Sequence, residues 1–304
     1  LLTRPEPTYV RANLTDALSE KLMNANVSFQ GEPIRLNQFL DYDSKALFKL
    51  SAKEVNDLTN GADFNVSKPT ESGDFYVERI FLDQSDTTYN SKEILKKLER
   101  RKILLLSDLA GAGKTTTFEY LTIKLKEKYP WMWVSYIDLK KYTEDFNDFE
   151  SSLSNNNSDT LFIEKISRNI LKNNDFDHEV FKESFNANNV TLFWDGVDEI
   201  SPIYEDLIIR LIRKVRDISK NKQFVSSRTS LQNRLENAFE ASVIRLQTFE
   251  TSDRIDFVTK FMKHEGFNDS MIEQEMATIQ KFFNKLLENT CDGDNPLMLQ
   301  MICT

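Results

Sequence analysis

Short apolar runs alternate with longer amphipathic stretches from Arg101 to about residue 250. Each apolar run has the length of a β-strand, and each following stretch carries hydrophobic residues at helical spacing. This alternation is typical of an α/β domain in which helices cover a parallel sheet. We therefore predict a five-stranded parallel sheet with strands at Ile103–Ser107, Trp133–Leu139, Val190–Trp194, Gln223–Ser226 and Ser242–Leu246.

The strand pattern stops after Leu246, and the rest of the chain has only helical periodicity. This change predicts a small helical subdomain at residues 251–304. The last helical pattern is cut at Thr304, so we expect the native polypeptide to continue. The expected helices are Ser252–Lys263, Ser270–Leu287 and Pro296–Ile302.

Residues 1–74 combine weakly helical stretches with turn-forming glycines and prolines, and they carry no recognisable chemistry. The two helical stretches are Leu14–Met23 and Ser44–Leu58. We expect a mostly helical segment of unknown role here, joined by a linker at residues 75–100 to the α/β domain at residues 101–250.

The amino-acid composition indicates a soluble globular protein. Of the 304 residues, 40% are hydrophobic and 29% are charged, which is the balance of a soluble globular chain. The longest apolar runs, Ile103–Leu106 and Val190–Trp194, are far shorter than the ~20 residues that cross a bilayer, so no membrane partner is expected. Cys291 and Cys303 are too few for a disulfide framework, which favours a cytoplasmic location.

Charge argues against nucleic-acid binding. The chain has 39 Lys and Arg against 48 Asp and Glu, a net charge of −9, whereas binding of phosphate backbones needs clustered basic residues. The basic stretches Lys96–Lys102 and Arg210–Arg216 are expected to be solvated helix faces. His178 and His264 are expected to be isolated surface residues, which leaves little for a catalytic triad or a histidine metal site.

A phosphate-binding loop is indicated where the strand at Ile103–Ser107 runs into the segment DLAGAGKTT and then into a helix. Two glycines let the backbone curl so that several N–H groups face one concavity, and the helix N-terminus adds positive potential. Lys114 would reach the β- and γ-phosphates, and the Thr115 hydroxyl would coordinate Mg²⁺. The candidate nucleotide-binding residues of the loop are Ala110, Gly111, Ala112, Gly113, Lys114, Thr115 and Thr116.

One position departs from the pattern GxxxxGK[ST], because Asp108 stands where the pattern has its first glycine. Aspartate tolerates left-handed backbone better than most residues, so the turn is compatible with it. A carboxylate beside a polyphosphate is unfavourable unless it points away. The tightness of phosphate binding therefore depends on where the Asp108 carboxylate points.

A second acidic motif follows the strand at Val190–Trp194, where the sequence reads DGVDE. Asp195 would hold the Mg²⁺ through a water molecule. Asp198 or Glu199 would orient the attacking water or act as the general base, and we favour Glu199. The alternative is that Asp198 and Glu199 cap the helix that begins near Pro202.

Arg228 ends the next predicted strand, in the segment QFVSSRT. At the carboxyl edge of a parallel sheet, beside a phosphate loop, an arginine would contact the γ-phosphate. The competing interpretation is an arginine at a helix start with no ligand.

The segments SDLAGAGKTT, LFWDGVDE, VSSRT and NPLML together resemble a NACHT module, the nucleotide-binding part of NOD-like receptors and related STAND ATPases. FYVERIF at Phe75–Phe81 resembles the segment that often precedes such modules. The resemblance covers about residues 75–304. It implies a P-loop ATPase of the ASCE type, in which the sensor strand at Gln223–Ser227 lies between the phosphate-loop strand and the acidic strand. It also implies that Pro296 contacts adenine.

The same resemblance implies a switch in innate immune or stress signalling rather than a metabolic enzyme. ADP would hold the module closed, exchange for ATP would open it and permit self-association, and slow ATP hydrolysis would reset it. ATP or ADP and Mg²⁺ are the expected cofactors.

Three alternatives stay open from the sequence. A P-loop kinase would transfer phosphate to a small molecule, but it would need an acceptor pocket and basic lid residues, whereas the region after Leu246 has only a plain helical pattern. A nucleic-acid translocating ATPase is disfavoured by the negative charge. A non-hydrolysing nucleotide-binding scaffold is compatible with the same motifs.

Overall fold

The computed structural model describes residues 26–29, 32–35, 76–129, 132–142, 159–171, 175–200 and 202–275. In the N-terminal region, β1 (Asn26–Phe29) and β2 (Glu32–Arg35) form a two-stranded antiparallel sheet that the sequence pattern did not predict. The helices expected at Leu14–Met23 and Ser44–Leu58 lie outside the described residues.

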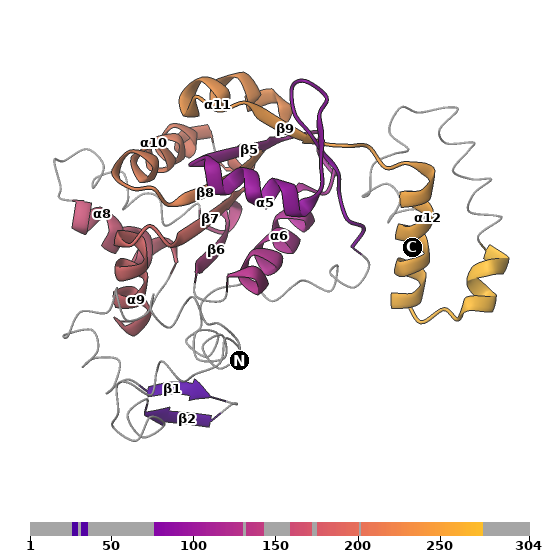
Figure 1. Ribbon diagram of the computed structural model, residues 1–304, viewed down its shortest axis with the longest axis horizontal. Coiled ribbons are helices and arrows are strands. Elements are labelled where there is room, and N and C mark those ends of the chain that lie inside the picture. The colour runs from indigo at the N-terminus through magenta and orange to yellow at the C-terminus, as the bar shows by residue number, and fades with distance from the viewer. Residues whose placement is uncertain are drawn as a thin grey trace.

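A seven-stranded, mostly parallel sheet forms the centre of the molecule, in the order β4-β3-β9-β5-β8-β7-β6 (Figure 1). All five predicted strands are present and parallel to their neighbours among these five. Their bounds are β5 (Ile103–Ser107), β6 (Trp133–Asp138), β7 (Val190–Asp195), β8 (Lys222–Ser227) and β9 (Val243–Leu246).

The predicted count of five strands is wrong, because two short strands extend the sheet. β3 (Phe81–Leu82) pairs antiparallel with β9, and β4 (Thr88–Tyr89) pairs antiparallel with β3. Two residues are too few to set up a period-two pattern, so the sequence shows no strand signal there. The predicted linker therefore contributes to the sheet.

The strand order brings three strand ends together at one edge. β8 lies between β5 and β7 and is parallel to both, which confirms the expected place of the strand before Arg228. Because parallel strands have their carboxyl ends at the same edge, Ser107, Asp195 and Ser227 finish side by side.

Helices cover both faces of the sheet (Figure 1). Alternate side chains of β5 point to opposite faces, with Ile103 and Leu105 in one buried cluster and Leu104 and Leu106 in the other. On one face lie α5 (Ser91–Arg100) and α6 (Lys114–Lys128). On the other lie α8 (Asp159–Lys165), α9 (Asp175–Asn186), α10 (Pro202–Ile218) and α11 (Gln232–Phe239).

The predicted surface positions are largely correct. α10 buries Leu211, Ile212 and Val215 and leaves Arg210 and Arg213 exposed, as expected of a solvated basic face. The exception is His178, which is buried on α9 rather than exposed.

The helix α12 (Thr251–His264) stands apart from the sheet and is reached through the segment after β9 (Figure 1). It confirms the helix expected at Ser252–Lys263. A further helical stretch covers residues 269–275, and the remainder of the predicted subdomain, including Pro296, lies outside the described residues. A separate small core joins this region to Val77 from the segment before β3; its other members are Phe249, Phe257, Val258, Phe261, Met262 and Ile272.

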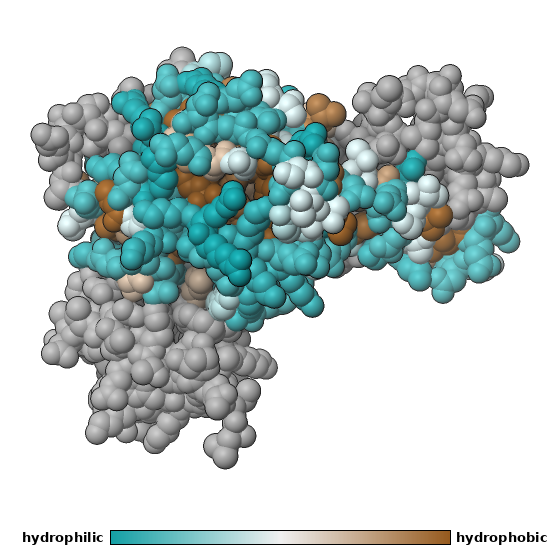
Figure 2. All heavy atoms as spheres, turned by 45° about the horizontal axis from the view of Figure 1, so that its top comes forward, coloured by the Kyte–Doolittle hydropathy of each residue, from teal (hydrophilic) through white to brown (hydrophobic). Residues whose placement is uncertain are grey.

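The visible hydrophobic surface in Figure 2 lies in small separate areas among hydrophilic residues. No helix in the described part of the chain is long and apolar enough to cross a membrane.

Candidate nucleotide site

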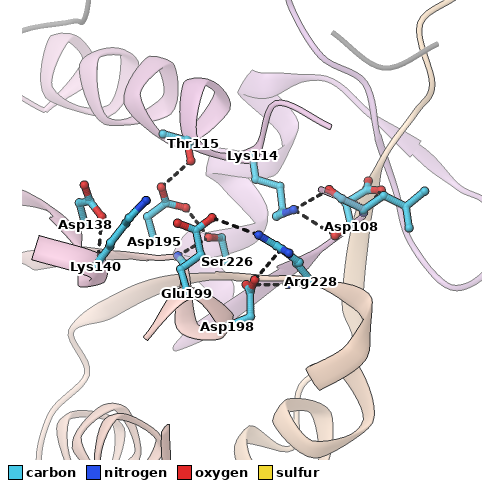
Figure 3. Close-up of polar contacts among 12 residues, drawn as sticks. Asp108, Lys114, Thr115, Asp138, Lys140, Asp195, Asp198, Glu199, Ser226 and Arg228 are labelled. Carbon is cyan, nitrogen blue, oxygen red and sulfur yellow. Dashed lines mark hydrogen bonds and ion pairs between the residues drawn. The ribbon is translucent and has the colours of Figure 1, made fainter. Parts of the chain in front are cut away.

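The phosphate loop lies at the carboxyl edge of the sheet, between the end of β5 and the start of α6 (Figure 3). Gly111 and Gly113 have φ angles of 74° and 88°, in the left-handed region that residues with a Cβ seldom adopt. These two glycines fold the backbone back over the helix start. The left-handed backbone at these two positions therefore explains why the motif has glycine there.

The N-terminus of α6 is available to an anion. Gly113 is the N-cap residue and provides no side chain to accept hydrogen bonds, and the first turn contains no acidic residue. The first N–H groups of a helix have no intrahelical acceptor, and the helix dipole places positive potential there. A phosphate group at this point would accept hydrogen bonds from those N–H groups.

Lys114 begins α6 and turns back across the loop. Its Nζ donates to the carbonyl oxygens of Asp108 at 3.0 Å and Leu109 at 2.7 Å. Burial lowers the pKa of Lys114, while the carboxylates of Asp108, Asp198 and Asp195 act in the opposite direction. The ammonium group is therefore held at the mouth of the loop by groups that a phosphate oxygen would replace.

The Asp108 carboxylate lies between the loop and β9. Oδ1 accepts from the backbone N–H of Leu109 at 2.8 Å, and Oδ2 accepts from the N–H of Leu246, at the end of β9, at 2.8 Å. Asp108 is not among the residues with positive φ, so the turn does not use the left-handed backbone that aspartate tolerates. The side chain instead joins the loop to β9.

Asp195 lies at the end of β7 and is 5% exposed. Its Oδ2 accepts from Thr115 Oγ1 at 2.7 Å and from the Tyr136 hydroxyl at 2.7 Å. Its Oδ1 accepts from Ser226 Oγ, which in turn accepts from the N–H of Gly196 at 2.9 Å. The predicted pair of Mg²⁺ ligands, Thr115 and Asp195, is thus in direct contact (Figure 3).

Asp198 and Glu199 lie in a 3₁₀ turn after β7 and face Arg228 (Figure 3). Asp198 Oδ1 accepts from the backbone N–H of Arg228 at 2.8 Å, and its Oδ2 lies 2.9 Å from Arg228 Nε. Glu199 Oε1 lies 3.9 Å from Arg228 Nη2. Asp198 therefore binds the loop after β8.

Gly196 separates Asp195 from this turn and has a φ of 78°. A Cβ at this position would lie 3.4 Å from Glu199 Cγ. The left-handed turn therefore favours glycine here, whereas an added Cβ would make an ordinary contact with Glu199.

A cavity of about 250 Å³ extends from the phosphate loop to the segment before β3 and to α12. At one end it is lined by charged and polar groups of the loop, the acidic turn and Arg228. At the other end it is lined by Tyr76, Val77, Arg79, Phe249 and Phe257. A charged end and an aromatic end within one cavity suit a ligand with a polyanionic part and a flat apolar part.

Arg79 is the charged group of the aromatic end, and it is only 4% exposed. Its Nη2 donates to the carbonyl of Gln247 at 2.7 Å, and its guanidinium lies 4.2 Å from the centre of the Phe249 ring. Its buried Nη1 has no hydrogen-bond partner among the described residues. Burial also lowers the pKa of Arg79. A buried donor of this kind is expected to meet a ligand atom.

Most of the residues predicted for the site line this one cavity. The lining of the cavity includes Ala110, Gly111, Gly113, Lys114, Thr115, Thr116, Asp195, Asp198, Glu199 and Arg228. Ala112 lies in the same loop, with its N–H donating to the Leu109 carbonyl at 3.4 Å. Pro296, the expected adenine contact, is outside the described residues.

Sequence reasoning missed Tyr136, Ser226 and the residues of the aromatic end, among them Arg79. Tyr136 and Ser226 lie inside predicted strands, where a hydroxyl group carries no distinctive signal. Arg79 lies in the segment FYVERIF, and an arginine within a short apolar stretch was the available indication.

A divalent cation fits the donor set. In the described part of the chain, no three His, Cys, Asp or Glu side chains gather as a metal-ligand cluster. A magnesium ion needs no such cluster, because it commonly keeps several waters and binds one or two protein oxygens together with substrate phosphates. Thr115 and Asp195 provide oxygens of that kind.

Comparison with known proteins gives distant likeness only. No protein-family model and no curated protein matches the chain. Domain III of the Thermotoga maritima replication initiation protein DnaA is 14% identical, with a TM-score of 0.40 over 78% of this chain and 93% of that domain.

A Walker-type ATPase of Pyrococcus abyssi is 12% identical, with a TM-score of 0.33 over 62% of this chain and 61% of that one. An ATP-binding subunit of an ABC transporter is also 12% identical, with a TM-score of 0.27 over 66% of this chain and all of that one. Likeness at this level assigns no family to the chain.

Proposed function

We propose that this chain is the ATP- and ADP-binding part of a NACHT-type signalling ATPase, a nucleotide-dependent switch with slow ATP hydrolysis. The observation that carries the proposal is one constellation at the carboxyl edge of the sheet. There the uncapped start of α6, Lys114, the bonded pair Thr115 and Asp195, and the pair Asp198 and Arg228 line a single cavity. Self-association of the full-length protein and a cytoplasmic signalling role belong to the same proposal.

The polyphosphate would bind at the start of α6. The N–H groups of the loop and the Lys114 ammonium would donate to its β- and γ-oxygens. Arg228 lies across the cavity mouth and is 51% exposed, so it can exchange its contact with Glu199 for a γ-phosphate oxygen. ATP and ADP would then differ in their contacts at Arg228.

The nucleoside would occupy the aromatic end. Val77, Phe249 and Phe257 supply apolar surface for a base, and Arg79 Nη1 supplies one donor for a ring nitrogen. The resemblance to NACHT modules favours adenine.

Hydrolysis would use Glu199 as the base. Its side chain is 42% exposed, whereas that of Asp198 is 8% exposed and bonded to the backbone of Arg228. Glu199 is thus the acid of the pair that can reach a water molecule and take its proton. A bound Mg²⁺ would supply charge neutralisation at the phosphates.

Contacts between the elements that share the cavity support the proposed switch. Lys260 Nζ on α12 donates to the Tyr76 carbonyl at 3.1 Å, and Gln247 N–H donates to the Ile80 carbonyl at 2.8 Å. The segment before β3 and the start of the helical region are therefore tied together beside the nucleotide. A nucleotide shifts such an arrangement only if its two forms bind the two conformations differently.

Hydrogen exchange of the chain with ADP and with a non-hydrolysable ATP analogue, each with Mg²⁺, tests the switch. We expect the peptides that cover residues 76–82 and 251–264 to differ in protection between the two nucleotides, because these segments line the aromatic end of the cavity. Peptides within α10 serve as the internal control and should not differ. Binding of both nucleotides with identical protection everywhere would contradict the switch and leave a static nucleotide-binding scaffold.

A further inference from the structure

Three hydroxyl groups from three different elements donate to the carboxylate of Asp195. Thr115 comes from the start of α6, Tyr136 from β6 and Ser226 from β8. Only Thr115 belongs to a nucleotide-binding motif. The other two are buried, with Tyr136 7% and Ser226 0% exposed.

The three hydrogen bonds use most of the acceptor positions of the Asp195 carboxylate. A carboxylate has about four acceptor positions, two on each oxygen. Oδ2 uses two of them, for Thr115 and Tyr136, while Oδ1 uses one, for Ser226. The carboxylate therefore keeps its orientation fixed and retains acceptor capacity on Oδ1.

Tyr136 is suited to be a permanent donor in this set. Its hydroxyl donates to Asp195 Oδ2 at 2.7 Å, and the side chain is buried. Its ring is held by the strand pairing of β6 with β7, in which Tyr136 lies opposite Phe193. A donor on a strand adjacent to Asp195 cannot move away when a ligand enters the loop.

From this geometry we infer that Tyr136 is a positioning residue for the divalent cation of the proposed nucleotide site. By occupying Oδ2 together with Thr115, it fixes the carboxylate so that the Thr115 hydroxyl donates its hydrogen bond to Asp195. The Thr115 oxygen lone pairs are then free to face the cation. The inference rests on the proposed function, because the cation would enter together with the nucleotide. Groups that orient metal ligands in this way commonly change metal affinity by about 10- to 100-fold.

The test is the Mg²⁺ dependence of ATP binding by the purified chain and its Tyr136→Phe variant. The variant keeps the ring and removes only the hydroxyl. We expect the Mg²⁺ concentration for half-maximal enhancement of ATP binding to rise about tenfold, while ATP affinity in EDTA stays unchanged. A merely structural role would alter binding with and without Mg²⁺ alike.

Tyr89→Phe is the matched control, because the Tyr89 hydroxyl donates to the Asp83 carboxylate at 2.8 Å, away from the cavity. This variant should keep the wild-type Mg²⁺ dependence. Ser226→Ala removes the donor to the other oxygen of Asp195, so it should shift the Mg²⁺ dependence in the same direction, and it provides a second test if Tyr136→Phe does not fold.

The possible outcomes distinguish failure of the positioning role of Tyr136 from failure of the proposed function. If wild-type chain binds ATP and folded Tyr136→Phe has an unchanged Mg²⁺ dependence, the positioning role is overturned and the proposed function stands. Equal loss of affinity with and without Mg²⁺ would also overturn it. If wild-type chain binds no nucleotide, the proposed function and this inference both fall.

Discussion

Glu199 and Asp198 are adjacent carboxylates with different environments. Asp198 is held by two contacts to Arg228, whereas Glu199 has one long contact to it and opens toward the cavity. Neighbouring acids of one motif therefore divide into a structural member and an accessible member. That division fits the preference for Glu199 as the base.

We predict that Glu199→Gln keeps ATP binding but lowers the rate of ATP hydrolysis by at least about 100-fold, because a positioned general base contributes about that much. Phosphate release under saturating ATP measures the rate, and titration calorimetry measures the binding. Glu127→Gln, an exposed change at the far end of α6, is the control and should hydrolyse ATP at the wild-type rate. A normal rate in the Glu199 variant would remove this residue from the catalytic role.

The motif residues of the site could be predicted from sequence, because their spacing is local. Gly111, Gly113, Lys114 and Thr115 lie within one turn-and-helix segment, where the backbone requirements decide the residue type. The partners Tyr136 and Ser226 could not be predicted, since they are 59 and 31 positions from Asp195. Only the strand order brings them to it.

The helix α6 connects the site to the core, and its far end contains a buried lysine. Lys126 is 8% exposed and donates to the Met132 carbonyl at 3.0 Å. Burial lowers its pKa to about 8. In the unfolded chain the same group keeps its proton to about pH 10.4.

The sign of the pH effect follows from these two pKa values. Between about pH 8 and pH 10.4 the unfolded chain binds more protons than the folded chain, so stability rises with pH through that window. Below about pH 8 the full cost of burying the charge is present.

We therefore predict that Lys126→Met raises the free energy of unfolding at pH 7 by about 2 kcal/mol, after allowing for the lost hydrogen bond to Met132. The gain should shrink as the pH approaches 10. Urea unfolding at both pH values measures it. Lys124→Met, at an exposed position of the same helix, should change stability little at either pH. A loss of stability in the Lys126 variant at pH 7 would show that the hydrogen bond outweighs the cost of burial.

Longer helices and strands were easier to predict from the sequence than short ones. The five long strands and α12 have clear periodicity, and their predicted bounds agree with the structure within a few residues. β3 and β4 are two residues each, so they form because β9 offers an unpaired edge rather than because of their own sequence. Whether such short strands form depends on pairing with a neighbouring strand.

At the scale of the whole molecule, the cavity is formed by three parts of the chain. The sheet edge supplies the charged end, while the segment before β3 and the region from Phe249 to α12 supply the aromatic end. Asp108 joins these parts, since its carboxylate binds the phosphate loop to the end of β9, just before the chain turns toward α12. The position that departs from the common motif thus lies on the path between loop and helical region.

The central claim is that the loop around Lys114 binds the phosphates of an adenine nucleotide. Titration calorimetry of the purified chain with ADP and with ATP, each with Mg²⁺, tests it most directly beside the Lys114→Ala variant. Lys124→Ala, on the same helix and exposed, is the control. We predict binding of both nucleotides by wild-type and control, and binding weakened at least about 30-fold, about 2 kcal/mol, in Lys114→Ala. No binding by the wild-type chain, or equal binding by Lys114→Ala, would contradict the account.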